Sequence, residues 1–75
     1  MDISKLKPGE TYIVKEITGA GAERQRLLDL GFVPGTPFVA FNIAPFGGTA
    51  LLGLRGYMLA LRQNACDLIK ADKKR

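Results

Sequence analysis

Residues 26–36 read RLLDLGFVPGT, and this stretch sets where the chain changes from helix to strand. Its leucines recur at helical spacing up to Gly31, which suits the left-handed position after a helix, and Phe32 can pack back on the last turn as in a Schellman motif. Residues 33–36 (VPGT) fit a type II turn, because proline presets one dihedral angle and glycine adopts the positive one. The stretch therefore predicts a helix that ends at Gly31 and a sharp turn into a strand.

Residues 19–31 as a whole are expected to form the main helix. At about 100° per residue, the apolar side chains share one arc and the polar side chains face away. The apolar set is Ala20, Leu27, Leu28 and Leu30, and the polar set is Gln25, Arg26 and Asp29. Upstream, a turn at residues 5–10 leads into residues 11–17 (TYIVKEI), whose β-branched and aromatic side chains predict the first strand.

The rest of the chain consists of short β segments separated by turn residues. The expected order is a strand at 38–44, a loop at 45–49, a hairpin of 50–54 and 57–61 around Arg55 and Gly56, a helical turn at 62–66 and a closing strand at 67–71. Five short strands with one early helix predict a mostly β fold, a small closed or nearly closed barrel. A length of 75 residues allows one domain, which we place at residues 1–71 with a basic tail at 72–75.

The chain has no histidine and a single cysteine, Cys66. Transition-metal sites draw mainly on these two residue types, and a nucleophile–histidine pair is impossible, so we expect no metal site, no catalytic residue, no cofactor and no enzymatic activity. Cys66 is interpreted as a small packing residue. A reactive thiol is the alternative, because Arg62 lies one helical turn earlier and would favour a thiolate.

The formal net charge is +4, but its distribution weakens the case for nucleic-acid binding. Residues 70–75 (KADKKR) hold four bases and one acid, +3, which leaves +1 for residues 1–69. A domain that binds phosphates should carry the excess on its folded face rather than at a terminus. No apolar run approaches the ~18 residues that span a bilayer, and a single cysteine suits a reducing compartment, so we expect a cytoplasmic protein.

The predicted hairpin carries apolar side chains on both of its faces. Alternation places Ala50, Leu52, Leu54, Tyr57, Leu59 and Leu61 inside, and Leu51, Gly53, Met58 and Ala60 outside. Phe46 is expected to project from the preceding loop. Either the helix covers this outer surface, or the surface is an exposed apolar patch of the kind that marks a partner site. The second interpretation makes the chain an interaction module.

Residues 26–36 resemble the signature of the FeoA family, as do residues 44–48 (APFGG), residues 57–62 (YMLALR), Ala65 and Ile69. The similarity covers nearly the whole chain. The family is similar to an SH3-like barrel with a helix inserted after the first strand, which agrees with the layout expected above. Its members are small cytosolic components of bacterial ferrous-iron uptake. The same module forms the C-terminal domain of metal-dependent repressors of the diphtheria-toxin-repressor type.

The resemblance implies a protein partner, the membrane GTPase-transporter FeoB, and contact with the membrane only through that partner. We expect Leu51, Met58 and Phe46 to bind it, and Arg24 and Arg26 to meet an acidic patch on its GTPase domain. A chain without histidine and with one cysteine is not expected to carry iron itself. Its expected connection to transition metals and iron homeostasis is through the transport of iron by its partner. The alternatives are a basic β-barrel that binds nucleic acid, a regulatory domain related to those of the repressors, and weak self-association through the same apolar face.

Overall fold

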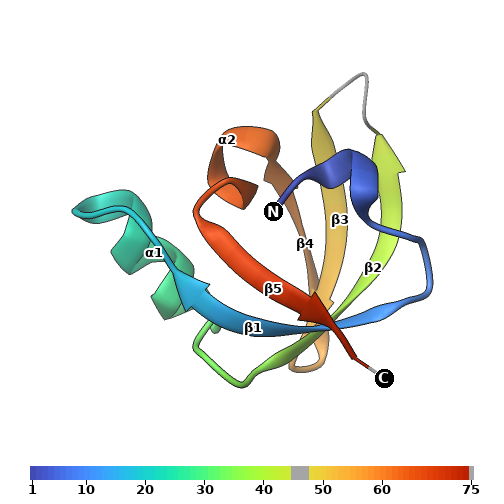
Figure 1. The fold of residues 1–75 in the computed structure, drawn as a ribbon, viewed down its shortest axis with the longest axis horizontal. Coiled ribbons are helices and arrows are strands. Elements are labelled where there is room, and N and C mark those ends of the chain that lie inside the picture. Colours follow the sequence, from blue (N-terminus) through green and yellow to red (C-terminus); the bar gives the residue numbers. More distant parts are fainter. Residues whose placement is uncertain (45–47, 75) are drawn as a thin grey trace.

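The computed structural model describes residues 1–44 and 48–74. The elements in chain order are η1 (Ile3–Lys5), β1 (Thr11–Ile17), α1 (Ala22–Leu30), β2 (Pro37–Ala44), β3 (Thr49–Leu54), β4 (Tyr57–Arg62), α2 (Gln63–Cys66) and β5 (Ile69–Lys73) (Figure 1). The five strands form one antiparallel sheet in the order β4-β3-β2-β1-β5. The predicted fold class, mostly β with one main helix after the first strand, is confirmed.

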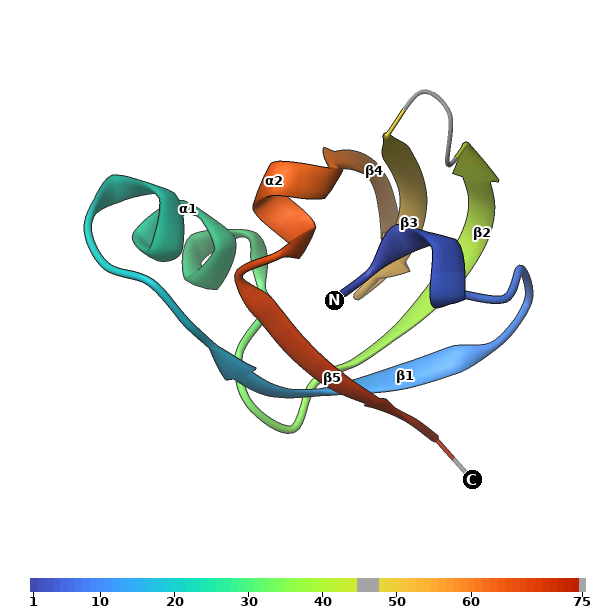
Figure 2. The ribbon, with the colours of Figure 1, turned by 45° about the horizontal axis from the view of Figure 1, so that its top comes forward.

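The sheet curves around a single core. Strands β2, β3 and β4 form one side of it, and β1 and β5 cross them, while α1 lies outside the curve next to α2 (Figures 1 and 2). The largest fully buried side chains are Phe32, Phe38, Ile3, Leu52, Ile69, Val14 and Cys66. Phe38 links the layers, because its ring stacks on Tyr12 at 5.7 Å between centroids and meets Phe32 edge-on at 5.8 Å.

The end of α1 follows the sequence prediction in detail. Gly31 has φ 113°, and its N–H donates to the Leu28 carbonyl at 3.0 Å while that of Phe32 donates to the Leu27 carbonyl at 3.1 Å. These two bonds are the Schellman pair. In the type II turn that follows, the Thr36 N–H donates to the Val33 carbonyl at 3.0 Å. Phe32 is thereby carried straight from the helix end into the core.

The start of α1 differs from the prediction, since the helix begins at Ala22 rather than at residue 19. The Thr18 N–H and hydroxyl both donate to the Leu68 carbonyl, at 2.7 and 3.1 Å, which holds Thr18 beside the α2–β5 connection. Gly19 and Gly21 then adopt positive φ angles of 84° and 81°, which a right-handed helix does not allow. Ala20 is consequently exposed outside the helix, and its predicted place in the apolar arc is wrong. Leu27 is buried, and Leu28 and Leu30 are half-buried against the core.

The hairpin of β3 and β4 forms around Arg55 and Gly56, as predicted. Both residues have positive φ angles, 48° and 87°, which is the conformation of a type I′ turn. Directly opposed pairs are Thr49–Arg62, Ala50–Leu61, Leu51–Ala60, Leu52–Leu59, Gly53–Met58 and Leu54–Tyr57. The predicted inner positions of Ala50, Leu52, Leu54 and Leu61 are confirmed by their burial, and Leu59 is half-buried.

The last strand runs two residues later than expected, over Ile69–Lys73 rather than 67–71. Pairing with β1 starts at Ile17–Ile69, next to the backbone bond from Thr18 to Leu68. Asp72 and Lys73 therefore belong to the sheet. Asp72 pairs with Lys15 at 3.3 Å and Lys73 pairs with Glu10 at 3.4 Å, so part of the basic C-terminal segment is neutralised on the folded surface.

Gln63, the first residue of α2, fixes the N-terminal segment to the barrel. Its Oε1 accepts a hydrogen bond from the Ile3 N–H at 3.0 Å, and its Nε2 donates to the Met1 carbonyl at 3.0 Å and to Asp67 Oδ1 at 2.6 Å. Ile3 is almost fully buried, and the sequence pattern did not identify it as a core residue. A polar side chain on α2 thus completes the apolar core.

Candidate partner-binding surfaces

A bulge in β2 produces the most exposed aromatic side chain of the sheet. Ala40 opposes Leu52 and Asn42 opposes Leu51, so Phe41 is an extra residue with no partner in register. Such an insertion twists the strand and redirects a side chain. Phe41 points out of the core and is 48% exposed.

Gly53 on β3 makes room for this ring. A Cβ built at Gly53 would lie 2.1 Å from Cε2 of Phe41, which no real pair of atoms allows. The absence of a side chain at Gly53 therefore lets the Phe41 ring lie against the β3 backbone, an aromatic covering a strand glycine. On the other side of Gly53 stands Met58, its partner in register, which is 60% exposed.

We call Val39, Phe41, Gly53 and Met58 the outer face. A shallow groove of about 640 Å³ runs along it and is bordered by Arg55 in the hairpin turn and by Lys74. The face is therefore apolar in the middle and basic at its rim. The sequence leaves open whether the helix covers this surface. In the structure α1 does not line the groove, so the exposed side chains of the outer face are not covered by the helix.

The residues predicted to bind a partner do not form one site. Met58 lies on the outer face, whereas Leu51, on the same side of the sheet, is half-buried opposite Ala60 and does not line the groove. Phe46 lies outside the described residues. Phe41 was not singled out from the sequence, although an outward aromatic beside a strand glycine was a usable signal.

Tyr57 was predicted to face inward and is instead 41% exposed. It stands at the first position of β4, beyond the edge of the core, and its hydroxyl donates a hydrogen bond to the Leu30 carbonyl at the end of α1. Tyr57 opposes Leu54 and so lies on the predicted face, but its expected burial is wrong, because its hydroxyl bonds to the helix end instead of the ring packing in the core.

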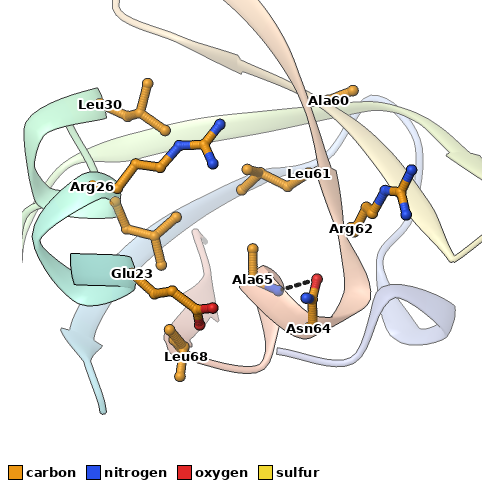
Figure 3. Close-up of a pocket in the computed structure, with 10 residues that line it drawn as sticks. Glu23, Arg26, Leu30, Ala60, Leu61, Arg62, Asn64, Ala65 and Leu68 are labelled. Atoms are coloured by element: carbon orange, nitrogen blue, oxygen red, sulfur yellow. Dashed lines mark hydrogen bonds between the residues drawn. The ribbon is translucent and has the colours of Figure 1, made fainter. Parts of the chain in front are cut away.

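The two helix arginines have different environments. Arg24 is half-buried, and its Nε donates to the Ile17 carbonyl at 3.2 Å, so it holds α1 to the end of β1. Arg26 is exposed and lines a second groove, of about 300 Å³, between α1 and β4. Figure 3 shows Arg26 reaching from α1 toward β4, with Arg62 on the far side of Leu61. The predicted pair therefore separates into one structural and one surface arginine.

The Cys66 thiol is fully buried, and this burial raises its pKa to about 11. The N-terminal amino group acts in the opposite direction and only partly offsets the effect, while Asp67 adds to it. The thiol is thus protonated at neutral pH, which supports the packing interpretation over the reactive one.

Within residues 1–44 and 48–74, no three or more His, Cys, Asp or Glu side chains come together in a way that could hold a metal ion. The same residues contain no helix that is long and apolar enough to cross a membrane. The features that stand out chemically are therefore surfaces: the outer face and the groove between α1 and β4.

Comparison with known proteins agrees with this picture. Residues 1–73 match the family model for the FeoA domain. A fusion of Fe(2+) transport protein A with the Fe(2+) transporter FeoB from Porphyromonas gingivalis is 26% identical over 72 residues, which cover 96% of this chain and 8% of that protein. The chain thus spans a small fraction of that relative.

Two solved structures are similar over most of their length. The FeoA protein of Chlorobium tepidum has a TM-score of 0.80 and 32% identity, over 97% of this chain and 70% of that one. Zinc-complexed FeoA of Stenotrophomonas maltophilia, described as a prokaryotic SH3 domain protein, has a TM-score of 0.80 and 26% identity, over 96% and 89%. With the SH3-like architecture shared and the family model matched over almost every residue, this chain belongs to the FeoA family.

Proposed function

We propose that this chain is a non-enzymatic cytoplasmic module that docks on the GTPase portion of an FeoB-type transporter and supports iron(II) uptake. The observation that carries the proposal is the exposed outer face, where Phe41 lies on Gly53 beside Met58. The fusion of an FeoA domain to FeoB in the Porphyromonas gingivalis relative supports the choice of partner, because a covalent link raises the effective concentration of two modules that work together.

The composition of the outer face suits a protein partner. Aromatic and methionine side chains are enriched in interface cores, where they contribute large contact area, and methionine adapts to irregular surfaces. Arg55 and Lys74 at the rim favour a partner patch that carries acidic side chains. Of the two, Arg55 is already oriented, because its guanidinium donates to the Thr36 hydroxyl at 3.3 Å.

The test is the affinity of the chain for the isolated GTPase domain of FeoB, measured by calorimetry in the GDP-bound and GTP-analogue-bound states. Met58→Asp places a charge in the middle of the outer face and should weaken binding about tenfold or more. Ala20→Asp is the matched control, since it adds the same charge at an exposed position before α1. Equal affinities for the two variants would remove the outer face from the interface, and no binding by the wild type in either state would remove the GTPase domain as partner.

Nucleic-acid binding receives less support from the structure than from the composition. The basic C-terminal segment pairs with carboxylates through Lys73–Glu10, and its own Asp72 pairs with Lys15. An oligonucleotide ligand would show affinity that falls steeply with salt. A flat fluorescence-anisotropy titration with a random oligonucleotide at low salt would exclude this alternative.

A further inference from the structure

Strand β4 is at one edge of the sheet, and its hydrogen-bonding pattern follows from the hairpin. In a hairpin with a two-residue turn, the residues that flank the turn, here Leu54 and Tyr57, form a hydrogen-bonded pair, and the pairs then alternate. Leu59 and Leu61 therefore bond to β3. Ala60 directs its N–H and C=O groups, and Arg62 its N–H group, away from β3 toward the open edge, where the described sheet has no further strand. The Arg62 carbonyl is the N-cap acceptor of α2 and is used by that helix.

The groove between α1 and β4 lies along this edge (Figure 3). Its apolar lining comes from Leu27, Leu61 and Leu68, while Ala60 is exposed at its rim. The bond from the Tyr57 hydroxyl to the Leu30 carbonyl joins β4 to α1 at the hairpin end. Open backbone groups thus border an apolar recess that starts where the helix and strand are tied together.

Charges in the groove are asymmetric. Arg26 on α1 and Arg62 at the end of β4 contribute two guanidinium groups to the lining, whereas Glu23 contributes one carboxylate and is drawn near Leu68 in Figure 3. Neither arginine is in an ion pair with a described residue. A ligand with carboxylates beside the two arginines, away from Glu23, would complement this pattern.

We propose that the edge of β4 takes up an extended acidic segment of a partner protein as an additional strand. The backbone of that segment would bond to the N–H and C=O groups of Ala60 and to the N–H group of Arg62, which is the β-augmentation mode of peptide recognition. Alternate side chains of a strand point to opposite faces, so apolar residues would enter the recess near Leu61 and acidic residues would meet Arg26 and Arg62. This site is separate from the outer face and does not depend on docking there.

A peptide fits the edge better than a nucleic acid does. The open groups of β4 alternate donor and acceptor at the spacing of a polypeptide backbone, whereas a phosphate backbone offers acceptors only. The carboxylate of Glu23 would also repel a run of phosphates. Native proteins usually block such edges with charge, proline or a covering element, and here the covering element, α1, leaves a groove.

The probe is a capped hexapeptide of alternating valine and glutamate, titrated to millimolar concentration into the 15N-labelled chain. We expect saturable shifts of the Ala60 and Arg62 amides and slower hydrogen exchange at both when peptide is bound. Replacing glutamate by lysine in the peptide should abolish these shifts. The absence of saturable shifts on β4, or shifts confined to the outer face, would overturn the proposal.

Ala60→Pro provides the sharpest variant. Proline removes only the outward N–H and is tolerated on edge strands, so the β3–β4 ladder stays intact while peptide affinity should fall about tenfold or more. Arg62→Glu, at an exposed position that does not threaten the fold, should give a similar loss by reversing the charge. Ala20→Asp is the control, because it adds a charge at an exposed position outside both grooves and should leave peptide affinity unchanged. Unchanged affinity in Ala60→Pro together with Arg62→Glu would contradict strand addition.

Discussion

The two faces of the β3–β4 hairpin are made by the same strands and have opposite roles. On the inner face, Leu52 is fully buried and lies between Ala50 and Leu54 in the core. On the outer face, Gly53 and Met58 oppose each other, and Met58 keeps more than half of its surface in water. Burial of apolar surface stabilises the fold, whereas exposed apolar surface gains energy only when a partner covers it. Substitutions on the inner face should therefore change stability, and those on the outer face should change binding.

The largest effect is expected from Leu52→Ala. This change leaves a cavity in a packed core and should lower the free energy of unfolding by about 2–5 kcal/mol. Met58→Ala, across the strand pair on the outer face, should change it by less than ~0.5 kcal/mol. Urea denaturation of both variants measures the difference. Similar losses for the two would mean that the outer face is part of the core.

Alkaline pH should act on the inner side through Cys66. Burial raises the pKa of this thiol from the ordinary 9.0 to about 11, so the unfolded chain loses the proton first as pH rises. Stability is therefore complete below about pH 9 and declines through the window up to about pH 11, by roughly 3 kcal/mol in all.

The measurement is the free energy of unfolding against pH for the wild type and for Cys66→Ala. The variant lacks the thiol, so only the wild type should lose this stability between about pH 9 and pH 11. The difference in free energy of unfolding between the two proteins should decrease accordingly over that range. Parallel curves would show that the thiol does not titrate differently in the folded and unfolded states.

The hydrogen bonds of the Gln63 side chain also stabilise the core side of the sheet. Gln63→Ala leaves the Ile3 N–H and the Met1 carbonyl without their side-chain partner and should cost about 1–3 kcal/mol. Gln63→Glu is the informative second variant, because it retains the acceptor for Ile3 but loses the donor to Met1 and to Asp67 and faces the Asp67 carboxylate. Thermal unfolding should rank wild type above Gln63→Glu and Gln63→Ala, and equal midpoints for all three would contradict the role of this side chain.

Gly53→Ala should change stability less than Leu52→Ala or Gln63→Ala does. The new Cβ must displace the Phe41 ring, while replacing glycine in a strand is itself favourable, so the net change should stay within about 1 kcal/mol. The displaced ring should nevertheless alter the outer face. We expect shifted Phe41 ring signals in NMR spectra and weaker binding to the GTPase domain. An unmoved ring would show that the outer face does not require glycine at this position.

Elements that depend on residues a few positions apart are predicted correctly from local sequence. The helix end at Gly31, the type II turn before β2 and the hairpin turn at Arg55 and Gly56 each depend on residues within a few positions of one another. Boundaries set by distant partners were missed. The register of β5 depends on its pairing with β1, which is distant in the chain. The start of α1 was missed for a local reason, because Gly19 and Gly21 adopt positive φ angles outside a helix.

The candidate surfaces follow the same division. Alternation alone placed Leu52 inside and Met58 outside, because the side-chain period of a strand is fixed by its backbone. The bulge at Phe41 and the groove that brings Arg26 to β4 are products of strand pairing and helix packing. The sequence by itself therefore determined the class of fold, the identity of the family and the absence of histidine chemistry. Only the tertiary structure decided which exposed side chains meet, since contact between distant segments depends on register and curvature rather than on local residue pattern.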